Sequence, residues 1–320
     1  MSLAQLRLLK RFLDAGQPDI PRPIADLRRG FEGFLIRLPG IDEVEVEATE
    51  IGGVPAEWVD ARADRSNPSA ARILYLHGGG FVLGSVRSHR QLAARLSRAA
   101  NARCLVLGYR LAPEHPYPAA LEDATAAYSV LSAEASSGPL ALAGDSAGGG
   151  LAILVAAQAR RDGLTLPAAL LCMSPWVDYA GHTPSLDRNA ALDPSIQRPG
   201  IERMARLYLA GADPDAPEVS PLRCSHTELP PTLVQAGGDE TLLDDAHALT
   251  AALEAAGVAV ELEVTPGMIH VWQLFAGRLD EGREAIERAG AFLNSHLLAA
   301  RRANVSRETT PSAPAQGALA

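Results

Sequence analysis

The chain has 320 residues, 47% hydrophobic and 21% charged, so it can bury a large core, and disorder along its whole length is excluded. Its formal net charge is −9, and it has no block of clustered Lys and Arg, which argues against binding to a nucleic-acid backbone. The three cysteines, Cys104, Cys172 and Cys224, are odd in number and far apart, which favours reduced thiols and a cytoplasmic protein.

The first residues are helical in pattern but interrupted by charges. Apolar residues with helical spacing occur at Leu3, Leu6, Leu9 and Phe12 or Leu13. We expect this face to dock on the body of the protein rather than on a membrane surface. No apolar run approaches the ~20 residues that cross a bilayer, and residues 1–16 lack the apolar stretch of a signal peptide. We therefore expect no stable membrane insertion.

From residue 43 onward, short apolar runs alternate with amphipathic stretches. The runs predict strands at 43–49, 54–61, 72–76, 103–109, 139–143, 168–173, 232–236 and 260–265. The stretches predict helices at 88–100, 120–134, 147–161, 241–256 and 280–298. This alternation indicates an α/β fold with a mostly parallel eight-stranded sheet flanked by helices, and the first two strands are expected to form an antiparallel edge.

Two segments do not follow the alternation. Residues 1–42 are helical with proline breaks, and residues 178–217, here called the insertion, are polar, with one helix expected near 199–209. We expect residues 1–42 and 181–217 to form a helical cap over a core of residues 43–180 and 218–300. The tail, 302–320, is rich in Ser, Thr, Pro and Ala and is expected to be disordered.

The strongest local motif is Gly144-Asp145-Ser146-Ala147-Gly148, which lies between a predicted strand and a predicted helix. A nucleophile elbow needs this context, because its turn is so tight that side chains at the glycine positions would collide with neighbouring backbone. A phosphate-binding glycine loop is the alternative, but neither G-x-G-x-x-G nor G-x-x-x-x-G-K-[ST] is present. The motif therefore indicates that Ser146 is a nucleophile.

A serine hydroxyl needs a base and a carboxylate, which in this fold follow it in the order acid, histidine. His270 lies in a glycine-containing loop after the last predicted strand and is the candidate base. Four carboxylates follow strand 232–236. Asp244 and Asp245 are explained by the dipole at the start of the next helix, which leaves Asp239 and Glu240 as candidate acids.

Acyl transfer also needs donors for the oxyanion that forms on the attacked carbonyl. The run His77-Gly78-Gly79-Gly80 follows strand 72–76 and offers backbone N–H groups that no side chain obstructs. The N–H of Ala147 is the expected partner donor. A plain flexible loop is the alternative for the glycine run, but its position after the strand favours the donor role.

Four motifs together resemble those of the hormone-sensitive-lipase-like carboxylesterases, the bacterial family IV esterases of the α/β-hydrolase fold. They are His77-Gly78-Gly79-Gly80-Phe81, the run Tyr109 to Ala120, the elbow Gly144 to Gly149, and Pro266-Gly267-Met268-Ile269-His270. The resemblance spans residues 43–298 and implies a catalytic triad with Ser146 as nucleophile and His270 as base. It also implies an oxyanion hole formed by Ala147 with Gly78, Gly79 or Gly80.

The same resemblance bears on the acid and on the cap. The family pattern D-P-L-x-D, aligned on Leu242 and Asp244, places the acid at Glu240 in place of the usual Asp, with Asp239 as the alternative. Family members carry a helical cap built from the N-terminus and an insertion after the sixth core strand, as in this chain.

The expected activity is that of a carboxylic ester hydrolase acting on short- to medium-chain acyl esters through an acyl-enzyme. The partner is thus a small-molecule ester. An amidase, lactonase or deacetylase could use the same groups, and a non-catalytic small-molecule receptor on the same fold is the alternative of a different class. No metal or cofactor is expected, because no H-E-x-x-H or zinc-spaced Cys/His cluster occurs. The sequence leaves open whether the chain forms a homodimer.

Overall fold

Eight strands form one sheet in the order β1-β2-β4-β3-β5-β6-β7-β8. The computed structural model describes residues 3–14, 22–66, 71–134 and 138–309. The strands are β1 (Glu45–Ile51), β2 (Val54–Asp60), β3 (Arg72–Leu76), β4 (Arg103–Leu107), β5 (Leu140–Asp145), β6 (Leu170–Met173), β7 (Thr232–Gly237) and β8 (Val260–Thr265). Only β1–β2 and β2–β4 pair antiparallel, so the predicted α/β sheet and its antiparallel edge are confirmed.

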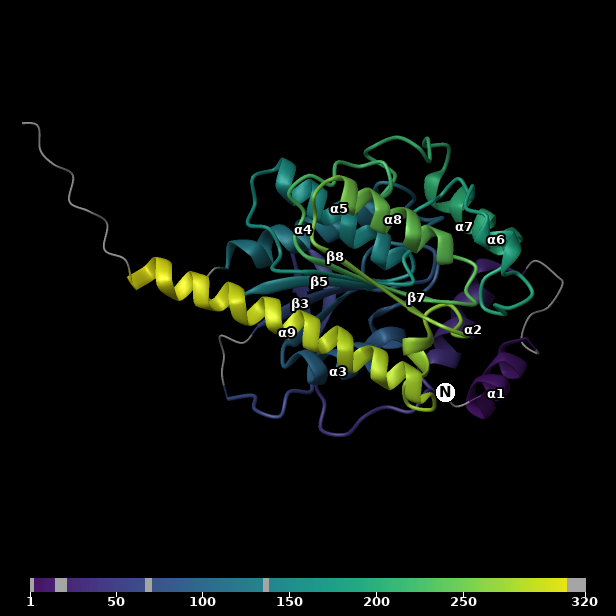
Figure 1. The fold of residues 1–320 in the computed structure, drawn as a ribbon, viewed down its shortest axis with the longest axis horizontal. Coiled ribbons are helices and arrows are strands. Elements are labelled where there is room, and N and C mark those ends of the chain that lie inside the picture. The colour runs from purple at the N-terminus through teal and green to yellow at the C-terminus, as the bar shows by residue number, and fades with distance from the viewer. Residues whose placement is uncertain (1–2, 15–21, 67–70, 135–137, 310–320) are drawn as a thin grey trace, which may run out of the picture.

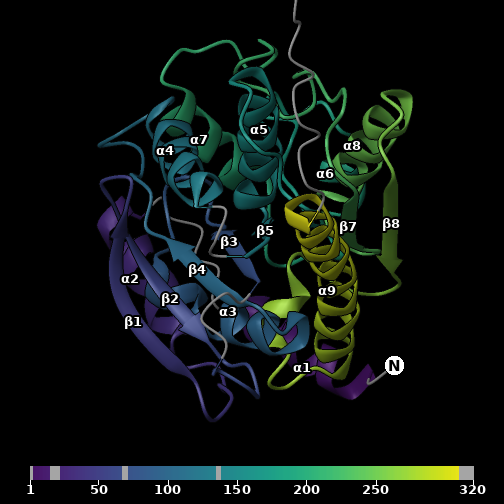
Figure 2. The same ribbon diagram turned by 90° about the vertical axis from the view of Figure 1, so that its left-hand side faces the viewer.

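Helices cover both faces of this sheet, as Figures 1 and 2 show. The first face packs against α3 (Val86–Ala100) and α9 (Asp280–Thr309), and the second against α4 (Ala119–Ala133), α5 (Ala147–Arg161) and α8 (Leu243–Ala255). In β3, the side chains of Ile73 and Tyr75 pack on the first face, and those of Leu74 and Leu76 pack on the second. Because both faces are buried, this strand has no polar alternation, which explains its continuous apolar run.

Four further helices lie at one end of the sheet (Figure 1). They are α1 (Leu3–Asp14), α2 (Ile24–Leu35), α6 (Ser185–Arg188) and α7 (Arg198–Leu209). In α1, Leu6 is buried among residues such as Met268 and Trp272, in agreement with the expected docking on the protein body. The side chains of Leu3, Leu9, Phe12 and Leu13 lie outside the described residues. Lys10 of α1 also forms an ion pair of 2.6 Å with Asp239.

Arg28 fastens α2 to the loops beyond β3 and β4. Its guanidinium donates to the carbonyl oxygens of Val82 and Ala112, at 2.8 Å each, and to both carboxylate oxygens of Glu114. The planar donor fork of arginine suits this combination of carbonyl and bidentate carboxylate contacts. The helix therefore holds the segment that directly follows the glycine run at 78–80.

The last helix is longer than the sequence suggested. The prediction of a disordered tail is wrong for residues 302–309, because α9 continues to Thr309, and residues 310–320 lie outside the described residues. Neither Gly nor Pro interrupts the chain from 291 to 310, so nothing stops the helix before Pro311. Within the described ranges, no helix combines the length and the apolar character needed to cross a bilayer.

Helices α3 and α9 touch at Gly290, which gives a test of the packing. A Cβ at Gly290 would lie 2.3 Å from Cβ of Ala99, so we expect Gly290→Ala to lower the stability by ~1–3 kcal/mol through overpacking. Thermal unfolding measures this. Gly200→Ala is the control, since no heavy atom outside its own helix turn lies within 4 Å of its added Cβ. Equal melting temperatures for the two variants would contradict the prediction.

Candidate active site

Ser146 lies at a sharp turn between β5 and α5. Its backbone has φ 52° and ψ −122°, an unfavourable conformation for a residue with a side chain. A Cβ at Gly148 would lie 1.9 Å from the carbonyl oxygen of Leu76, and one at Gly144 would lie 2.3 Å from the carbonyl oxygen of Gly148. The amide of Ser146 donates to the carbonyl of Met173 at 2.8 Å. The two glycines are therefore required by backbone contact, and the predicted strand–turn–helix context is present.

The glycine run after β3 forms a loop beside this turn. Gly79 and Gly80 have φ values of 114° and 63°. The amide of Gly78 donates to Oδ1 of Asp145 at 3.0 Å, so it is already engaged. In the described part of the chain no hydrogen bond uses the amides of Gly79, Gly80 or Ala147. Of the four predicted oxyanion donors, three are thus free, while Gly78 supports the loop.

Asp145, the residue before the nucleophile, is buried beneath that loop. Its carboxylate accepts from the Tyr75 hydroxyl at 2.6 Å and lies 3.4 Å from Nε2 of His89. Burial alone would raise the pKa of Asp145, but attraction to the nearby His89 imidazole and the hydrogen bond from Tyr75 bring it below its usual value. Asp145 therefore serves as a fixed anion that holds Gly78 in place.

The His77 ring packs against the glycine loop and stays neutral. Its ring stacks on Tyr109 at 4.3 Å between centroids and on His89 at 5.3 Å. Burial, with repulsion from His89, lowers the pKa of His77 to about 3. A Cβ at Gly84 would lie 2.4 Å from Nδ1 of His77, so the ring and the loop backbone are in direct contact.

Glu240 is completely buried after β7. Its Oε2 accepts from the Ser174 hydroxyl at 2.6 Å and from the amide of Gly237 at 2.8 Å, whereas Oε1 has no hydrogen-bond partner among the described residues. Burial raises the pKa of Glu240 to about 8, and the charges of Asp193 and Asp245 add to this effect. The carboxyl group is therefore held in one orientation by the bonds to Oε2, while Oε1 remains available as an acceptor.

His270 follows β8 and is also buried. Its Nδ1 has no hydrogen-bond partner among the described residues, so it is not bonded to Glu240 in this structure. Burial lowers the pKa of His270, which the carboxylates of Asp193 and Asp145 partly oppose. A bond between Nδ1 and Oε1 of Glu240 would satisfy both unpaired atoms, and hydrogen bonds of this kind often tighten only when substrate binds.

The two candidate acids differ in environment. The Asp239 side chain is about one quarter exposed and is paired with Lys10, while Glu240 is enclosed beside Ser174. The parallel strands β5, β7 and β8 end at the same edge of the sheet. Ser146, Glu240 and His270, which follow these strands, therefore lie along that edge.

Three buried residues near the site were missed from the sequence. Asp145 and His89 belong to the network under the glycine run, and Asp193 accepts hydrogen bonds from the amides of Thr241 and His270. His89 looked like an ordinary residue of an amphipathic helix. Asp193 lies in the polar insertion, where nothing in the local sequence separates it from surface carboxylates.

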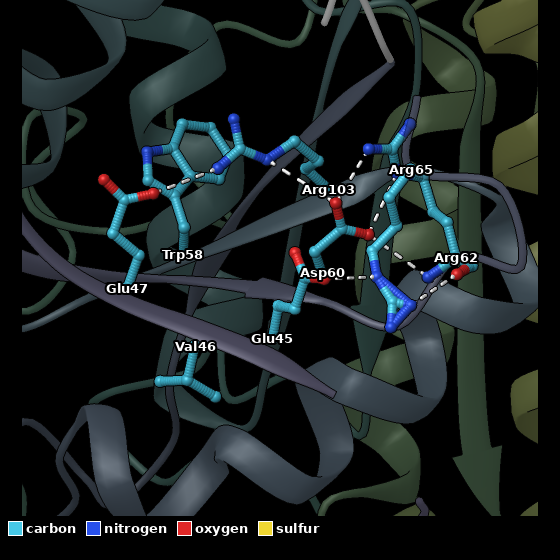
Figure 3. Close-up of a pocket in the computed structure, with 8 residues that line it drawn as sticks. All are labelled: Glu45, Val46, Glu47, Trp58, Asp60, Arg62, Arg65 and Arg103. Carbon is cyan, nitrogen blue, oxygen red and sulfur yellow. Dashed lines mark hydrogen bonds and ion pairs between the residues drawn. The ribbon is translucent and has the colours of Figure 1, made fainter. Parts of the chain in front are cut away.

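A pocket also lies away from these residues, at the outer strands β1 and β2 (Figure 3). It has a volume of about 430 Å³ and is open to solvent. Arg103 stacks over Trp58 at 4.4 Å, and the arginines that line the pocket pair with its carboxylates, as Arg62 does with Asp60 at 2.7 Å and Arg65 with Glu45 at 3.1 Å. These charges neutralise one another, so the pocket favours neither anions nor cations.

Comparison with known proteins places these features in context. A family model described as the alpha/beta hydrolase fold matches residues 73–274. An acetyl-hydrolase of Streptomyces hygroscopicus is 47% identical over 252 residues, which cover 78% of this chain and 82% of that protein. A carboxylesterase/phospholipase of Mycobacterium tuberculosis, LipF, is 33% identical over 302 residues, with 91% of this chain and 80% of that protein covered.

The chain is also similar to solved structures. An esterase from the bacterial hormone-sensitive lipase family is 44% identical, with a TM-score of 0.87 and coverage of 93% of this chain and 99% of that chain. EstE5, soaked with p-nitrophenyl butyrate, is 41% identical, with a TM-score of 0.86 and coverage of 92% and 99%.

The buried carboxyl of Glu240 predicts a pH-dependent stability. Its pKa rises on folding from 4.5 to about 8, so the folded state favours the protonated form, and this stabilisation is complete below pH 4.5 and is lost as the pH rises from there to about 8. We expect the melting temperature of the wild type to fall between pH 5 and pH 8 more steeply than that of Glu240→Gln. Asp239→Asn, altered at the surface, should keep the wild-type slope. Parallel curves for wild type and Glu240→Gln would contradict this.

Proposed function

The chain belongs to the alpha/beta hydrolase family and is a carboxylic ester hydrolase, and from that premise we propose that Ser146, His270 and Glu240 carry out the reaction. The observation that carries the proposal is the strained turn at Ser146 beside three free backbone amides. Such a turn is retained only where surrounding contacts enforce it, which is typical of a functional residue.

In the proposed mechanism the Ser146 hydroxyl attacks the ester carbonyl while His270 accepts its proton. The amides of Gly79, Gly80 and Ala147 stabilise the negative oxygen of the tetrahedral intermediate. His270 then gives the proton to the departing alcohol, which leaves an acyl-serine. Water repeats the same steps with His270 as base, so that the acid is released and the Ser146 hydroxyl is restored.

Glu240 is the proposed acid of the triad. Its Oε1 is the oxygen left free to accept from Nδ1–H of His270, while Ser174 and Gly237 hold its other oxygen. This role needs the ionised form of Glu240, which a pKa of about 8 in the free protein places on the alkaline side of neutrality. Once ionised, Glu240 would fix the imidazole tautomer and stabilise its cation without taking the proton. Asp239 is the weaker candidate, since its carboxylate is paired with Lys10.

We propose that residues 1–42 and 181–217 act as the cap over a hydrolase core of residues 43–180 and 218–300. Tyr208 of α7 stacks on Phe81 at 3.7 Å, directly after the glycine run. A Cβ at Gly80 would lie 2.9 Å from Cγ of Met204, so α7 closes over the proposed oxyanion hole. The similarity to an acetyl-hydrolase and to EstE5, which was soaked with p-nitrophenyl butyrate, supports a short- to medium-chain acyl group, although an amide or a lactone could be attacked by the same serine.

We also propose a cytoplasmic location, no nucleic-acid partner and no stable membrane insertion. The three cysteines are free and buried, which suits a reducing compartment. For a homodimer, the outer edge of β8, the last strand of the sheet, offers a surface for pairing.

The activity is tested with p-nitrophenyl esters from acetate to palmitate. We expect kcat/KM to peak at short or medium chains, and Ser146→Ala to lower kcat by at least ~10³-fold, because only binding and the oxyanion amides remain. Unfolding curves of the variant control for its folding. Turnover that persists in Ser146→Ala would overturn the assignment of the nucleophile, and a maximum at palmitate would overturn the chain-length proposal.

The identity of the acid is tested with two neutral isosteres. Glu240→Gln is expected to lower kcat by ~10³–10⁴-fold with little change in KM, since the imidazolium loses its counter-charge. Asp239→Asn, which removes only the surface pair with Lys10, is expected to cost less than ~10-fold. A larger loss in Asp239→Asn would assign the acid to Asp239 instead.

A further inference from the structure

The insertion binds the turn that carries the proposed acid. Nδ2 of Asn189 donates to the carbonyl oxygen of Glu240 at 2.8 Å, and the Thr241 hydroxyl donates to the carbonyl oxygen of Ile196 at 3.3 Å. The amide of Thr241 donates to Oδ2 of Asp193 at 3.2 Å. Three residues of the insertion thus contact this turn, and two of them, Asn189 and Asp193, bind main-chain atoms of Glu240 and Thr241.

Asp193 links this turn to the proposed base. The same Oδ2 accepts from the backbone amide of His270 at 3.3 Å, and Oδ1 accepts from the amide of Ser195 at 2.8 Å. The side chain is fully buried, and no ion pair reaches it in the parts of the chain that the structure describes. A buried carboxylate without a cation costs stability, and three backbone donors offset that cost only in part. Its presence therefore points to a role besides stability.

The charge of Asp193 acts on both proposed partners of the nucleophile. It raises the pKa of Glu240 and also that of His270, because like charge opposes ionisation of the carboxyl and opposite charge favours the imidazolium. The other charged groups that act on them are Asp145, which raises the pKa of His270, and Asp245, which raises that of Glu240.

We propose that Asp193 is a positioning residue of the reaction: its carboxylate fixes the Glu240 turn against the His270 loop, and its charge stabilises the imidazolium formed during acyl transfer. This inference rests on the proposed function. Because Nδ1 of His270 and Oε1 of Glu240 are unbonded in the free protein, their approach depends on how the two backbones are held, and Oδ2 of Asp193 is an atom shared by both.

The test compares Asp193→Asn with wild type in kcat, KM and the pH dependence of kcat/KM on p-nitrophenyl butyrate. We expect kcat to fall ~10–100-fold, as small misplacements of reacting groups do, with KM nearly unchanged. Loss of the negative charge lowers the pKa of both Glu240 and His270, so the acid limb of the profile should move to lower pH. An unmoved acid limb, or unchanged kcat, would overturn the proposal.

Two further variants separate the contributions. Asn189→Ala removes one bond to the Glu240 turn but keeps the charge, so it should lower kcat without moving the acid limb, and it tests the positioning role even if Asp193→Asn does not fold. An unchanged kcat in Asn189→Ala would count against that role. Asp187→Asn, in the same insertion but in an exposed pair with Arg198, is the matched control and should behave as wild type.

The two proposals fail in different ways. If the wild type hydrolyses no ester in a Ser146-dependent manner, the proposed function is wrong and the role of Asp193 falls with it. If the wild type is active and Asp193→Asn retains either its kcat or its acid limb, only the role of Asp193 is wrong.

Discussion

Backbone contact between the end of β3 and the start of α5 is the constraint on which the rest of the site depends. Where Gly148 passes the carbonyl of Leu76 there is no space for a side chain, so the two segments approach as closely as main chains can. That approach sets the amides of the glycine run beside the amide that follows Ser146. The Asp145 carboxylate holds the loop by accepting a hydrogen bond from the Gly78 amide. The proposed oxyanion donors are therefore arranged before any substrate binds.

The carboxyl groups of Glu240, Asp193 and Asp245 lie close enough for their charges to interact, and all are buried. Burial raises the pKa of Asp245 to about 7, as it raises that of Glu240 to about 8, so the folded chain resists ionising this region. A protein selected only for stability would replace such groups by apolar ones. These buried carboxyl groups thus lower the stability of the fold, and in return they provide ordered hydrogen-bond acceptors around His270.

The sequence predicted what local pattern can determine, namely the eight strands, the turn at Ser146 and the loop of His270. Contacts between distant segments were beyond it. That the amide of Gly78 is occupied depends on a side chain 67 positions later, and Asp193 gains its importance only when the insertion folds back onto residues near 241 and 270. The tail was misjudged at 302–309 because its composition outweighed the absence of a helix breaker before Pro311.

The pair between Lys10 and Asp239 has a practical consequence. Lys10 is the only lysine in the sequence, and its side chain is about one quarter exposed. Amine-directed chemistry on lysine side chains, whether a fluorescent label or attachment to a solid support, is therefore confined to one helix that lies against the residue next to Glu240. A dye placed there would report movement of α1 relative to the end of β7, whereas immobilisation through the same amine would hold that helix to the support.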